Sequence, residues 1–376
     1  MKVGVPKESL AGERRVALVP EAARGLVKAN IQVAVEAGAG ASAFFSDASY
    51  MDAGANVSDR ATALASDAVL KVQPPTLDEV GQLRPGAVLI SFLQPATNAD
   101  VISALARQKV TAFSLDLVPR ISRAQSMDAL SSQANVGGYK SVLLAANHLP
   151  KFFPLLMTAA GTVAPARVLV MGAGVAGLQV IATARRLGAV VEAYDVRPAV
   201  KDEVHSLGAT FLELPLEAQE GAGGYAREQS EDFLRRQREL IGDRVAASDV
   251  VITTAAIPGR KAPILVTADM VRRMRAGSVI VDLAAETGGN CELTKPGDVI
   301  EVNGVTIDGT TNLPSTMPVH ASQLYSKNVS TLLLLLVKDG AITLDFTDEI
   351  VKGACVTHDG AIANPRAKEL VEAASR

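Results

Sequence analysis

The chain has 376 residues, a length that suggests two domains, each able to bury a hydrophobic core of its own. Its formal net charge at pH 7 is −3, so it has no general electrostatic attraction to nucleic acid or to an anionic membrane surface. We therefore expect no nucleic-acid partner, and any other partner must be recognised through a local site.

The cysteines and the apolar segments narrow the class further. Cys291 and Cys355 lie far apart and in no metal-like spacing, so we expect a reducing compartment and no metal site. The first residues enter a strand-like pattern without the apolar core of a signal peptide, which favours a cytoplasmic chain. The apolar run Leu332–Val337 is much shorter than the roughly 20 residues of a membrane span and predicts a buried helix, with no direct membrane span.

Short β-rich runs alternate with helical runs along nearly the whole chain, which is typical of doubly wound α/β domains. In the first domain, strands are predicted at Lys2–Val5, Gln32–Glu36, Ala68–Val72, Ala87–Phe92 and Thr111–Ser114, and helices at Glu21–Ala29 and Ala99–Gln108. The pair Gly38 and Gly40 follows the second strand, but there is no full glycine fingerprint. We therefore predict a Rossmann-like domain that binds no dinucleotide.

A polar loop after the fifth strand supplies Arg120, Gln125, Asp128 and Ser131. Steps of three residues nearly close a helical turn, so the last three can share one face of a helix start and converge on a ligand. The residues alone leave open a plainer alternative, in which Arg120 and Asp128 form a surface ion pair and Ser126 caps the helix.

Two long helical patterns, from about Ser126 to His148 and from about Ala321 to Lys338, are predicted to join the domains. Residues 1–128 and 325–376 would then form the N-terminal domain and residues 129–324 the second, with a cleft between them. The pair Gly137-Gly138 inside the first helix costs about 2 kcal/mol relative to two alanines. We interpret it as a close approach of another backbone rather than as a hinge.

The second domain opens on a complete dinucleotide-binding unit. The strand Arg167–Met171 leads into Gly172-Ala173-Gly174-Val175, and a helical pattern continues through Gly177. In such a unit the first glycine permits a tight turn, the second lets the backbone approach a pyrophosphate, and the third lets the helix pack on the strand. The pyrophosphate meets the N-terminus of the helix.

The next strand closes on Asp195, which we expect to accept both ribose hydroxyls of NAD. Arg197, which follows Val196, is placed where an arginine can hold the 2′-phosphate of NADP. Because the Asp195 carboxylate repels that phosphate, the sequence favours NAD.

The remaining strands of this domain are predicted at Val190–Asp195, Ala209–Glu213, Val250–Thr254, Val279–Leu283 and Val305–Asp308. A helix is predicted over Thr267–Arg275, with Thr267 as its N-cap and Gly277 just beyond its end. Residues 215–233 are glycine-rich and carry one aromatic ring, at Tyr225. Composition leaves open whether they form a mobile lid or a surface loop without a role.

These features together resemble one family over the whole chain, the NAD(H)-binding component (domain I, the first alpha polypeptide) of proton-translocating nicotinamide nucleotide transhydrogenase, a relative of alanine dehydrogenase. The matching segments are Val3–Glu8, Glu13–Ala17, Pro119–Asp128, Tyr194–Arg197, Glu217–Ala226, Leu283–Cys291 and Cys355–Ile362. The segments at 120–128 and 224–225 distinguish this branch from the dehydrogenases.

The resemblance implies a protein that binds NADH, docks on a separate NADP-binding component, and passes hydride directly between two nicotinamide rings. It implies nicotinamide contacts at Arg120, Gln125, Asp128 and Ser131, and further nucleotide contacts at Gly224, Tyr225, Gln237 and Ala256. The loop that carries Tyr225 would close over the bound nucleotide.

The same resemblance implies the partners. Proton movement would be coupled through membrane subunits, so this chain is expected to be a peripheral subunit on the cytoplasmic face of the inner membrane. Its partners would be an NADP-binding beta subunit and the membrane subunits, and the family suggests a homodimer.

Ring-to-ring hydride transfer needs no general base, whereas oxidation of an alcohol or amine does. By the resemblance, the catalytic His of alanine dehydrogenases corresponds here to Gln94, and their Asp corresponds to Glu286. Arg15 and Lys71, which resemble the substrate-carboxylate ligands of that family, are retained. A soluble alanine-dehydrogenase-like enzyme is thus one alternative, and an NAD-sensing module without chemistry is the other.

Overall fold

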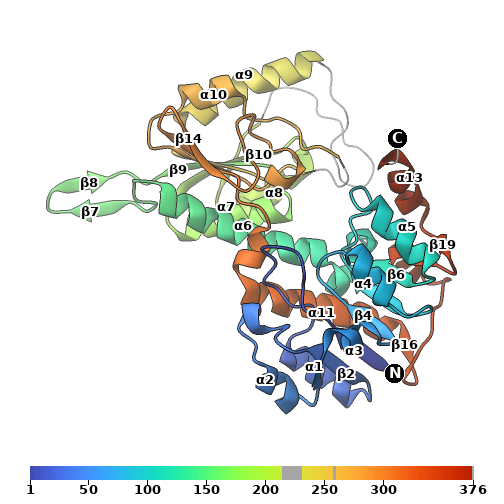
Figure 1. Ribbon diagram of the computed structural model, residues 1–376. Coiled ribbons are helices and arrows are strands. Elements are labelled where there is room, and N and C mark those ends of the chain that lie inside the picture. The colour runs from blue at the N-terminus through green and yellow to red at the C-terminus, as the bar shows by residue number, and fades with distance from the viewer. Residues whose placement is uncertain (214–230, 257–259, 375–376) are drawn as a thin grey trace. The chain divides into compact units, whose positions relative to one another are not determined.

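The computed structural model describes residues 1–213, 231–256 and 260–374, with residues 231–237 as backbone only (Figure 1). The chain divides into two compact units. Unit 1 comprises Met1–Gln133 and Pro314–Arg376, and unit 2 comprises Ala134–Leu313. The domain borders expected from the sequence, at 128/129 and 324/325, lie five and eleven residues away from these.

Unit 1 is built on an eight-stranded sheet in the order β19-β18-β6-β5-β4-β1-β2-β3. The bounds are β1 (Lys2–Val5), β2 (Gln32–Glu36), β3 (Asn56–Ser58), β4 (Ala68–Leu70), β5 (Val88–Ser91), β6 (Thr111–Ser114), β18 (Cys355–His358) and β19 (Ala361–Ile362). The first six are parallel and lie in the order 3-2-1-4-5-6, which confirms the predicted Rossmann-like architecture. β18 and β19 extend the sheet as antiparallel strands.

Helices cover both faces of this sheet. One apolar core takes residues from α1 (Pro20–Lys28), α2 (Asp47–Asp52), α11 (Pro318–Leu335) and α12 (Glu349–Ala354). The other takes residues from α3 (Arg60–Leu64), α4 (Leu77–Gln82), α5 (Ala99–Arg107) and α13 (Pro365–Ala374). The apolar run at 332–337 ends α11, and Leu332, Leu333 and Leu336 are fully buried in the first core, so the predicted buried helix is confirmed. A small hairpin, β16 (Val337–Lys338) and β17 (Ala341–Ile342), follows.

Unit 2 has a seven-stranded sheet in the order β11-β10-β9-β12-β13-β15-β14. The bounds are β9 (Arg167–Met171), β10 (Val190–Tyr194), β11 (Thr210–Phe211), β12 (Val250–Thr253), β13 (Val279–Asp282), β14 (Val299–Val302) and β15 (Val305–Asp308). Six strands are parallel in the order 3-2-1-4-5-6, and β14 is antiparallel at the edge. The strand order reverses between β9 and β12, and dinucleotides bind at the carboxyl ends of the strands at such a point.

The helices of unit 2 again form two layers. α6 (Ala129–His148), α7 (Val175–Arg186) and α8 (Lys201–Ser206) share one apolar core with the sheet, and α9 (Glu231–Ala247) and α10 (Ala268–Arg273) share the other. Thr267 caps α10 by accepting from the Met270 N–H, as predicted. α10 ends at Arg273, two residues before the predicted end, and Gly277 follows with φ of 85°.

α6 (Ala129–His148) contains residues of both units, whereas α11 lies wholly within unit 1, so the chain changes unit ahead of α11. The predicted start of the first helix, near Ser126, is three residues early, because Ser122–Met127 forms a 3-10 helix, η3. Within α6, a Cβ atom on Gly138 would lie only 2.4 Å from the Ala176 carbonyl oxygen, which confirms a close backbone approach at the glycine pair.

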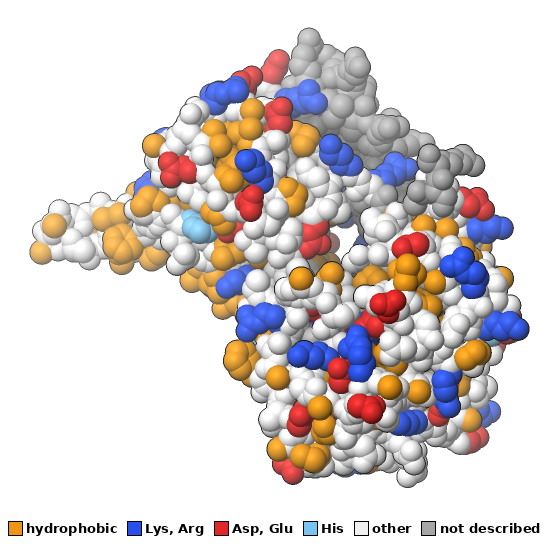
Figure 2. Space-filling model, viewed as in Figure 1, with side chains coloured by type: hydrophobic (Ala, Val, Ile, Leu, Met, Phe, Trp, Pro, Cys, Tyr) orange, Lys and Arg blue, Asp and Glu red, His pale blue; other side chains and the backbone are white. Residues whose placement is uncertain are grey.

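The edge strand β14 was not predicted, and neither was a hairpin of unit 2. β7 (Leu156–Thr158) and β8 (Gly161–Val163) form a two-stranded hairpin that extends away from the sheet (Figure 1). Apolar side chains gather along it (Figure 2). In the hairpin Met157 is 77% exposed, and Phe152 and Leu155, which precede β7, are exposed as well.

Candidate functional site

The turn after β9 has the geometry expected of the fingerprint glycines. Gly172 has φ of 103°, a left-handed value that favours glycine, and its N–H donates to the Tyr194 carbonyl at 2.8 Å. A Cβ atom at Gly172 would lie 2.6 Å from Thr254 Oγ1, and one at Gly177 would lie 1.8 Å from the Gly172 carbonyl oxygen. Both the turn and the packing of α7 against it therefore require glycine.

α7 begins directly after Gly174. Among the described residues, a Cβ atom at Gly174 would meet only the Arg197 guanidinium, at 3.9 Å, and Val175, the first residue of the helix, is 40% exposed. The first N–H groups of a helix have no partner within it, and the helix dipole adds partial positive charge there. The arrangement can receive an anion such as a pyrophosphate.

Asp195 directly follows β10, and both of its carboxylate oxygens accept hydrogen bonds. Oδ2 accepts from the Ala173 N–H at 2.8 Å and from Arg197 Nη2 at 2.9 Å. Oδ1 accepts from the Arg197 N–H at 2.8 Å and from Arg197 Nε at 3.0 Å. Burial acts to raise the pKa of Asp195, but the hydrogen bonds from Arg197 and Ala173 outweigh it and hold that pKa below its ordinary value. The carboxylate is therefore charged at neutral pH.

The other predicted cofactor residues are placed as follows. Val196 is partly buried against the core that α9 and α10 share, and Ala256 is exposed after β12. Gly224 and Tyr225 lie outside the described residues, as does the side chain of Gln237.

The loop after β6 carries the second group of predicted residues, all in unit 1. Arg120 and Gln125 are exposed, and Gln125 lies in η3. Asp128 caps α6, because its carboxylate accepts from the Ser131 N–H at 2.8 Å and from the Ser131 hydroxyl at 2.6 Å. Asp128 and Ser131 are thus bonded to each other, beside the exposed amide of Gln125.

This loop is anchored by α11 and α12. Arg123 donates to both carboxylate oxygens of Asp348, at 2.6 and 2.8 Å, and Asn328 Nδ2 donates to the Ser126 carbonyl at 2.9 Å. The bonds between Arg123 and Asp348 raise the pKa of the arginine and lower that of the carboxyl. Gln125 therefore projects from a loop that is fixed on either side of it.

Charged side chains are buried at the carboxyl end of the unit 1 sheet. Arg15, which is 4% exposed, donates to both oxygens of Glu13 at 2.8 and 2.7 Å and to Gln133 Oε1 at 2.9 Å. Gln73 Nε2 also donates to Glu13, at 2.8 Å. The guanidinium that resembles a substrate ligand is thus already paired with a carboxylate of its own chain.

Lys71 is also paired within unit 1. Its fully buried ammonium lies 3.2 Å from Glu8 and 3.3 Å from Glu79. Burial raises the pKa of Glu8, against the attraction of Lys71. Arg15 and Lys71 were singled out from the sequence, but their carboxylate partners were not. Two of these partners could have been suspected from their positions, because Glu8 lies just after β1 and Glu79 lies in the first turn of α4.

Gln94 lies just after β5 with φ of 46° and is exposed. Asp116 holds this turn, since its Oδ2 accepts from the Leu93 and Gln94 N–H groups at 2.8 and 2.9 Å and from the Ser114 hydroxyl at 2.6 Å. Burial raises the pKa of Asp116. At Gln94, which the resemblance aligns with the catalytic His of alanine dehydrogenases, the segment therefore presents an amide, which does not titrate.

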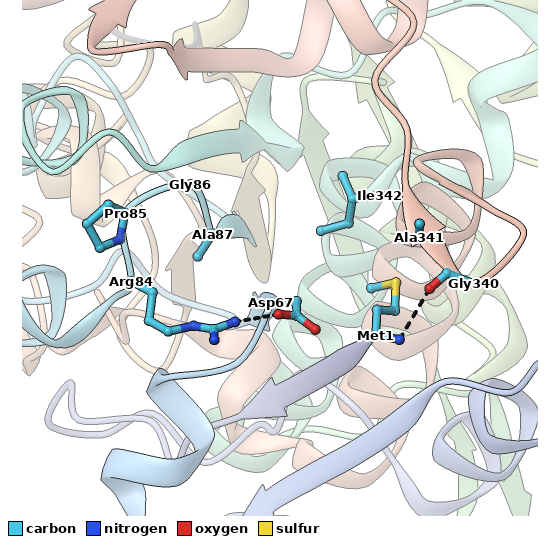
Figure 3. Close-up of a pocket in the computed structure, with 9 residues that line it drawn as sticks. All are labelled: Met1, Asp67, Arg84, Pro85, Gly86, Ala87, Gly340, Ala341 and Ile342. Carbon is cyan, nitrogen blue, oxygen red and sulfur yellow. Dashed lines mark hydrogen bonds and ion pairs between the residues drawn. The ribbon is translucent and has the colours of Figure 1, made fainter.

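A pocket of about 600 Å³ lies at the opposite end of the unit 1 sheet (Figure 3). Asp67 and Arg84 pair at its wall, and the Met1 amino group donates to the Gly340 carbonyl at 3.2 Å. It sits before β1, β4 and β5, at their amino ends. Because ligands of doubly wound sheets bind at the carboxyl ends, we do not take this pocket as the functional site.

Among the described residues, no group of three or more His, Cys, Asp or Glu is placed to hold a metal ion. Over the same described ranges, no helix combines the length and the hydropathy that crossing a membrane requires. Cys291 and Cys355 are buried free thiols, and burial raises their pKa values to about 11 and about 12. Both stay protonated at neutral pH.

Comparison with known proteins gives consistent matches over the chain. The model of the alanine dehydrogenase/PNT N-terminal domain matches residues 4–137, and that of the C-terminal domain matches residues 141–365. The first of the polypeptides that make up NAD(P) transhydrogenase subunit alpha in Rhodospirillum rubrum is 49% identical, over 97% of this chain and 98% of that protein. The crystal structure of transhydrogenase from Sinorhizobium meliloti superposes with a TM-score of 0.86 at 45% identity, over 97% of this chain and 100% of that one. L-alanine dehydrogenase superposes with a TM-score of 0.85 at 29% identity, over 100% of both chains.

Proposed function

This chain belongs to the alanine dehydrogenase/PNT family, and within it to the transhydrogenase alpha subunits, and we propose that it binds NAD(H) and exchanges hydride directly with NADP(H) held on a partner component. One observation carries the proposal. Unit 2 has a complete nucleotide turn closed by a charged Asp195, while the segment at Gln94 offers no general base. Ring-to-ring hydride transfer suits this arrangement, because no proton leaves the substrate and no general base is required.

The residues of unit 2 fit NAD(H). The open backbone at Gly174 and the start of α7 would hold the pyrophosphate, and Asp195 would accept the adenosine ribose hydroxyls. Since each oxygen of Asp195 already accepts two hydrogen bonds, Arg197 would release part of the carboxylate as the ribose arrives. When bound, the dihydronicotinamide supplies the hydride, and the protein supplies its alignment.

We assign the nicotinamide contacts to the loop after β6 in unit 1. The Gln125 amide has both donors and an acceptor, which match those of a nicotinamide carboxamide, and Arg120 would reach the adjoining ribose. The bonded pair Asp128 and Ser131 would complete the set and keep the start of α6 in place. Gly224, Tyr225, Gln237 and Ala256 are assigned further nucleotide contacts.

We also propose that the chain works as a homodimer, on the cytoplasmic face of the inner membrane, with an NADP-binding beta subunit and with membrane subunits that couple hydride transfer to proton translocation. The hairpin of unit 2 supports the dimer. Residues 152–166 contain no charged side chain, and Leu155, Met157 and Val163 are 53%, 77% and 41% exposed. An uncharged, exposed strand edge is normally covered by a partner.

The test mixes the purified protein with a purified NADP-binding component and follows reduction of an NAD analogue by NADPH. Rapid exchange supports the proposal. Binding of NADH without exchange would favour the NAD-sensing module instead. Turnover of pyruvate and ammonia with NADH would favour an alanine-dehydrogenase-like enzyme, a function that the internal pairing of Arg15 and Lys71 disfavours.

A further inference from the structure

A buried carboxylate organises the loop that follows β13. Asp282 is 1% exposed, and its Oδ2 accepts from the Asn290 N–H at 2.8 Å and the Cys291 N–H at 3.0 Å, as well as from the Thr294 hydroxyl at 2.7 Å. Its Oδ1 accepts from the Thr253 hydroxyl, which ends β12, at 2.9 Å. The loop after β13 is thus fastened to the end of the neighbouring strand.

Asn290 extends this connection with its side chain, which is fully buried. Its Oδ1 accepts from the Ala255 N–H at 3.0 Å, and its Nδ2 donates to the carbonyls of Ala255 and Pro263, both at 2.8 Å. One amide therefore engages both backbone polar groups of Ala255. These hydrogen bonds, together with the one from the Thr254 N–H to the Met171 carbonyl at 2.8 Å, restrict the conformation of residues 254–255 after β12.

That segment rests on the glycine turn. Thr254 Oγ1 donates to the Gly172 carbonyl at 2.9 Å, and the Ala255 nitrogen would be 3.3 Å from a Cβ atom at Gly172. Asp195 closes β10 on one side of β9, and the segment 254–256 follows β12 on the other. A dinucleotide that crosses the sheet here has its adenosine half toward β10 and its nicotinamide half toward β12.

We propose that Asn290 is a positioning residue: it sets the segment 254–256 against the glycine turn and thereby aligns the nicotinamide half of the nucleotide, leaving the adenosine half to Asp195. This inference rests on the proposed function. Asn290 itself would not touch the nucleotide, because its side chain is buried and its hydrogen-bonding atoms are used by Ala255 and Pro263.

The test is Asn290→Asp, which keeps the acceptor for Ala255 but replaces the two donors with a carboxylate oxygen that faces carbonyls. The matched control is Asn364→Asp in unit 1, where a buried Asn likewise accepts from the Ala367 N–H and donates to the Gly353 carbonyl. Hydride exchange with the NADP-binding component is measured alongside the dissociation constants of NADH and 5′-AMP.

We expect Asn290→Asp to slow exchange at least about tenfold and the control to leave it unchanged, because small displacements of a reacting ring cost large factors in rate. The 5′-AMP dissociation constant should change less than about threefold in both variants, since an adenosine ligand does not depend on the nicotinamide half. Equal exchange rates in the two variants, or a parallel loss of 5′-AMP and NADH binding in Asn290→Asp, would overturn the inference.

Two further measurements keep the result interpretable. If Asn290→Asp does not fold, Thr254→Val, which removes the bond to Gly172, should show the same split between exchange rate and 5′-AMP binding, and lack of that split would refute the role. If the unmutated protein binds NADH but exchanges no hydride, the proposed function fails. In that case the positioning role of Asn290 is tested by the fluorescence of bound NADH. This fluorescence should change in Asn290→Asp and should not change in Asn364→Asp.

Discussion

Two neighbouring glycines in α6 should respond in opposite ways to the same substitution. A Cβ atom on Gly138 would lie 2.4 Å from the Ala176 carbonyl oxygen and 3.1 Å from the Gln179 Cβ. Within the part of the chain that the structure describes, one on Gly137 would meet only Leu283 Cδ2, at 3.8 Å, and Leu313 Cβ, at 4.0 Å. Gly137 is therefore an internal control, because both substitutions change the same residue type in the same helix.

The magnitudes follow from helix propensity and overpacking. Either substitution by alanine gains about 0.5–1 kcal/mol from helix propensity. At Gly138 the carbon–oxygen contact is roughly 1 Å closer than even a weak C–H···O contact allows, so α6 and α7 must separate, at a typical cost of about 1–3 kcal/mol. We expect Gly137→Ala to raise the free energy of unfolding. The free energy of unfolding of Gly138→Ala should be about 1–3 kcal/mol lower than that of Gly137→Ala.

The same two substitutions should also have different effects on NADH affinity. Ala176 lies in the first turn of α7, so a shift at Gly138 moves the helix end that is proposed to hold the pyrophosphate. NADH affinity should fall in Gly138→Ala and stay unchanged in Gly137→Ala. Denaturant unfolding and NADH fluorescence titration measure the two effects. Equal stability and equal affinity of the two variants would refute the reasoning.

Asp195→Ala should narrow the preference for NADH over NADPH by about 1–3 kcal/mol, through loss of charge-assisted hydrogen bonds and of phosphate repulsion; equal affinities in the unmutated protein, by titration, would contradict the role of Asp195. Gln125→Asn should slow hydride exchange strongly while the NADH dissociation constant changes less than about tenfold, and full rate with lost affinity would argue against it. Burial raises the pKa of Glu8 in the folded protein above its ordinary value of 4.5. The contribution of Glu8 to the free energy of unfolding is therefore fully present below pH 4.5 and is lost as the pH rises through the pKa that Glu8 has in the folded protein. Glu8→Gln should remove this loss in unfolding measured between about pH 4 and 8, and an unchanged pH dependence would contradict it. Met157→Glu should convert the dimer to monomers in sedimentation without loss of fold, whereas a persistent dimer would exclude the hairpin as the interface.

The parallel strands other than β3 could be predicted because each is a short, mostly buried apolar run between turn residues. β3 could not, since Asn56–Ser58 is short, partly polar and at the sheet edge. The antiparallel pair β18 and β19 also escaped prediction, because its place depends on pairing with β6, more than two hundred residues earlier. The hairpin of β7 and β8 reads as an uncharged loop from sequence, since nothing local specifies its pairing.

The candidate site also contains some residues that could be predicted from the sequence and others that could not. The glycine turn and Asp195 were predictable because they lie within one local strand-turn-helix-strand unit. The carboxylates that pair with Arg15 and Lys71 were not, because a sequence pattern does not say which charges meet once strand ends come together. The capping role of Asp128 was available from sequence, where it precedes a helix as a good N-cap residue, but Ser126 competed for it.

The contacts of Asp195 link cofactor choice to the shape of the turn. One carboxylate fixes the Ala173 N–H, which belongs to the fingerprint turn, and also holds Arg197, the group best placed to bind a 2′-phosphate. While Asp195 stays charged, Arg197 is neutralised and the turn is set for a ribose with free hydroxyls. Loss of the carboxylate would release the cation and one anchor of the turn together. If Asp195 recognises the ribose as proposed, selection against NADP needs no separate steric barrier, because the same carboxylate also occupies the arginine that would accept the phosphate.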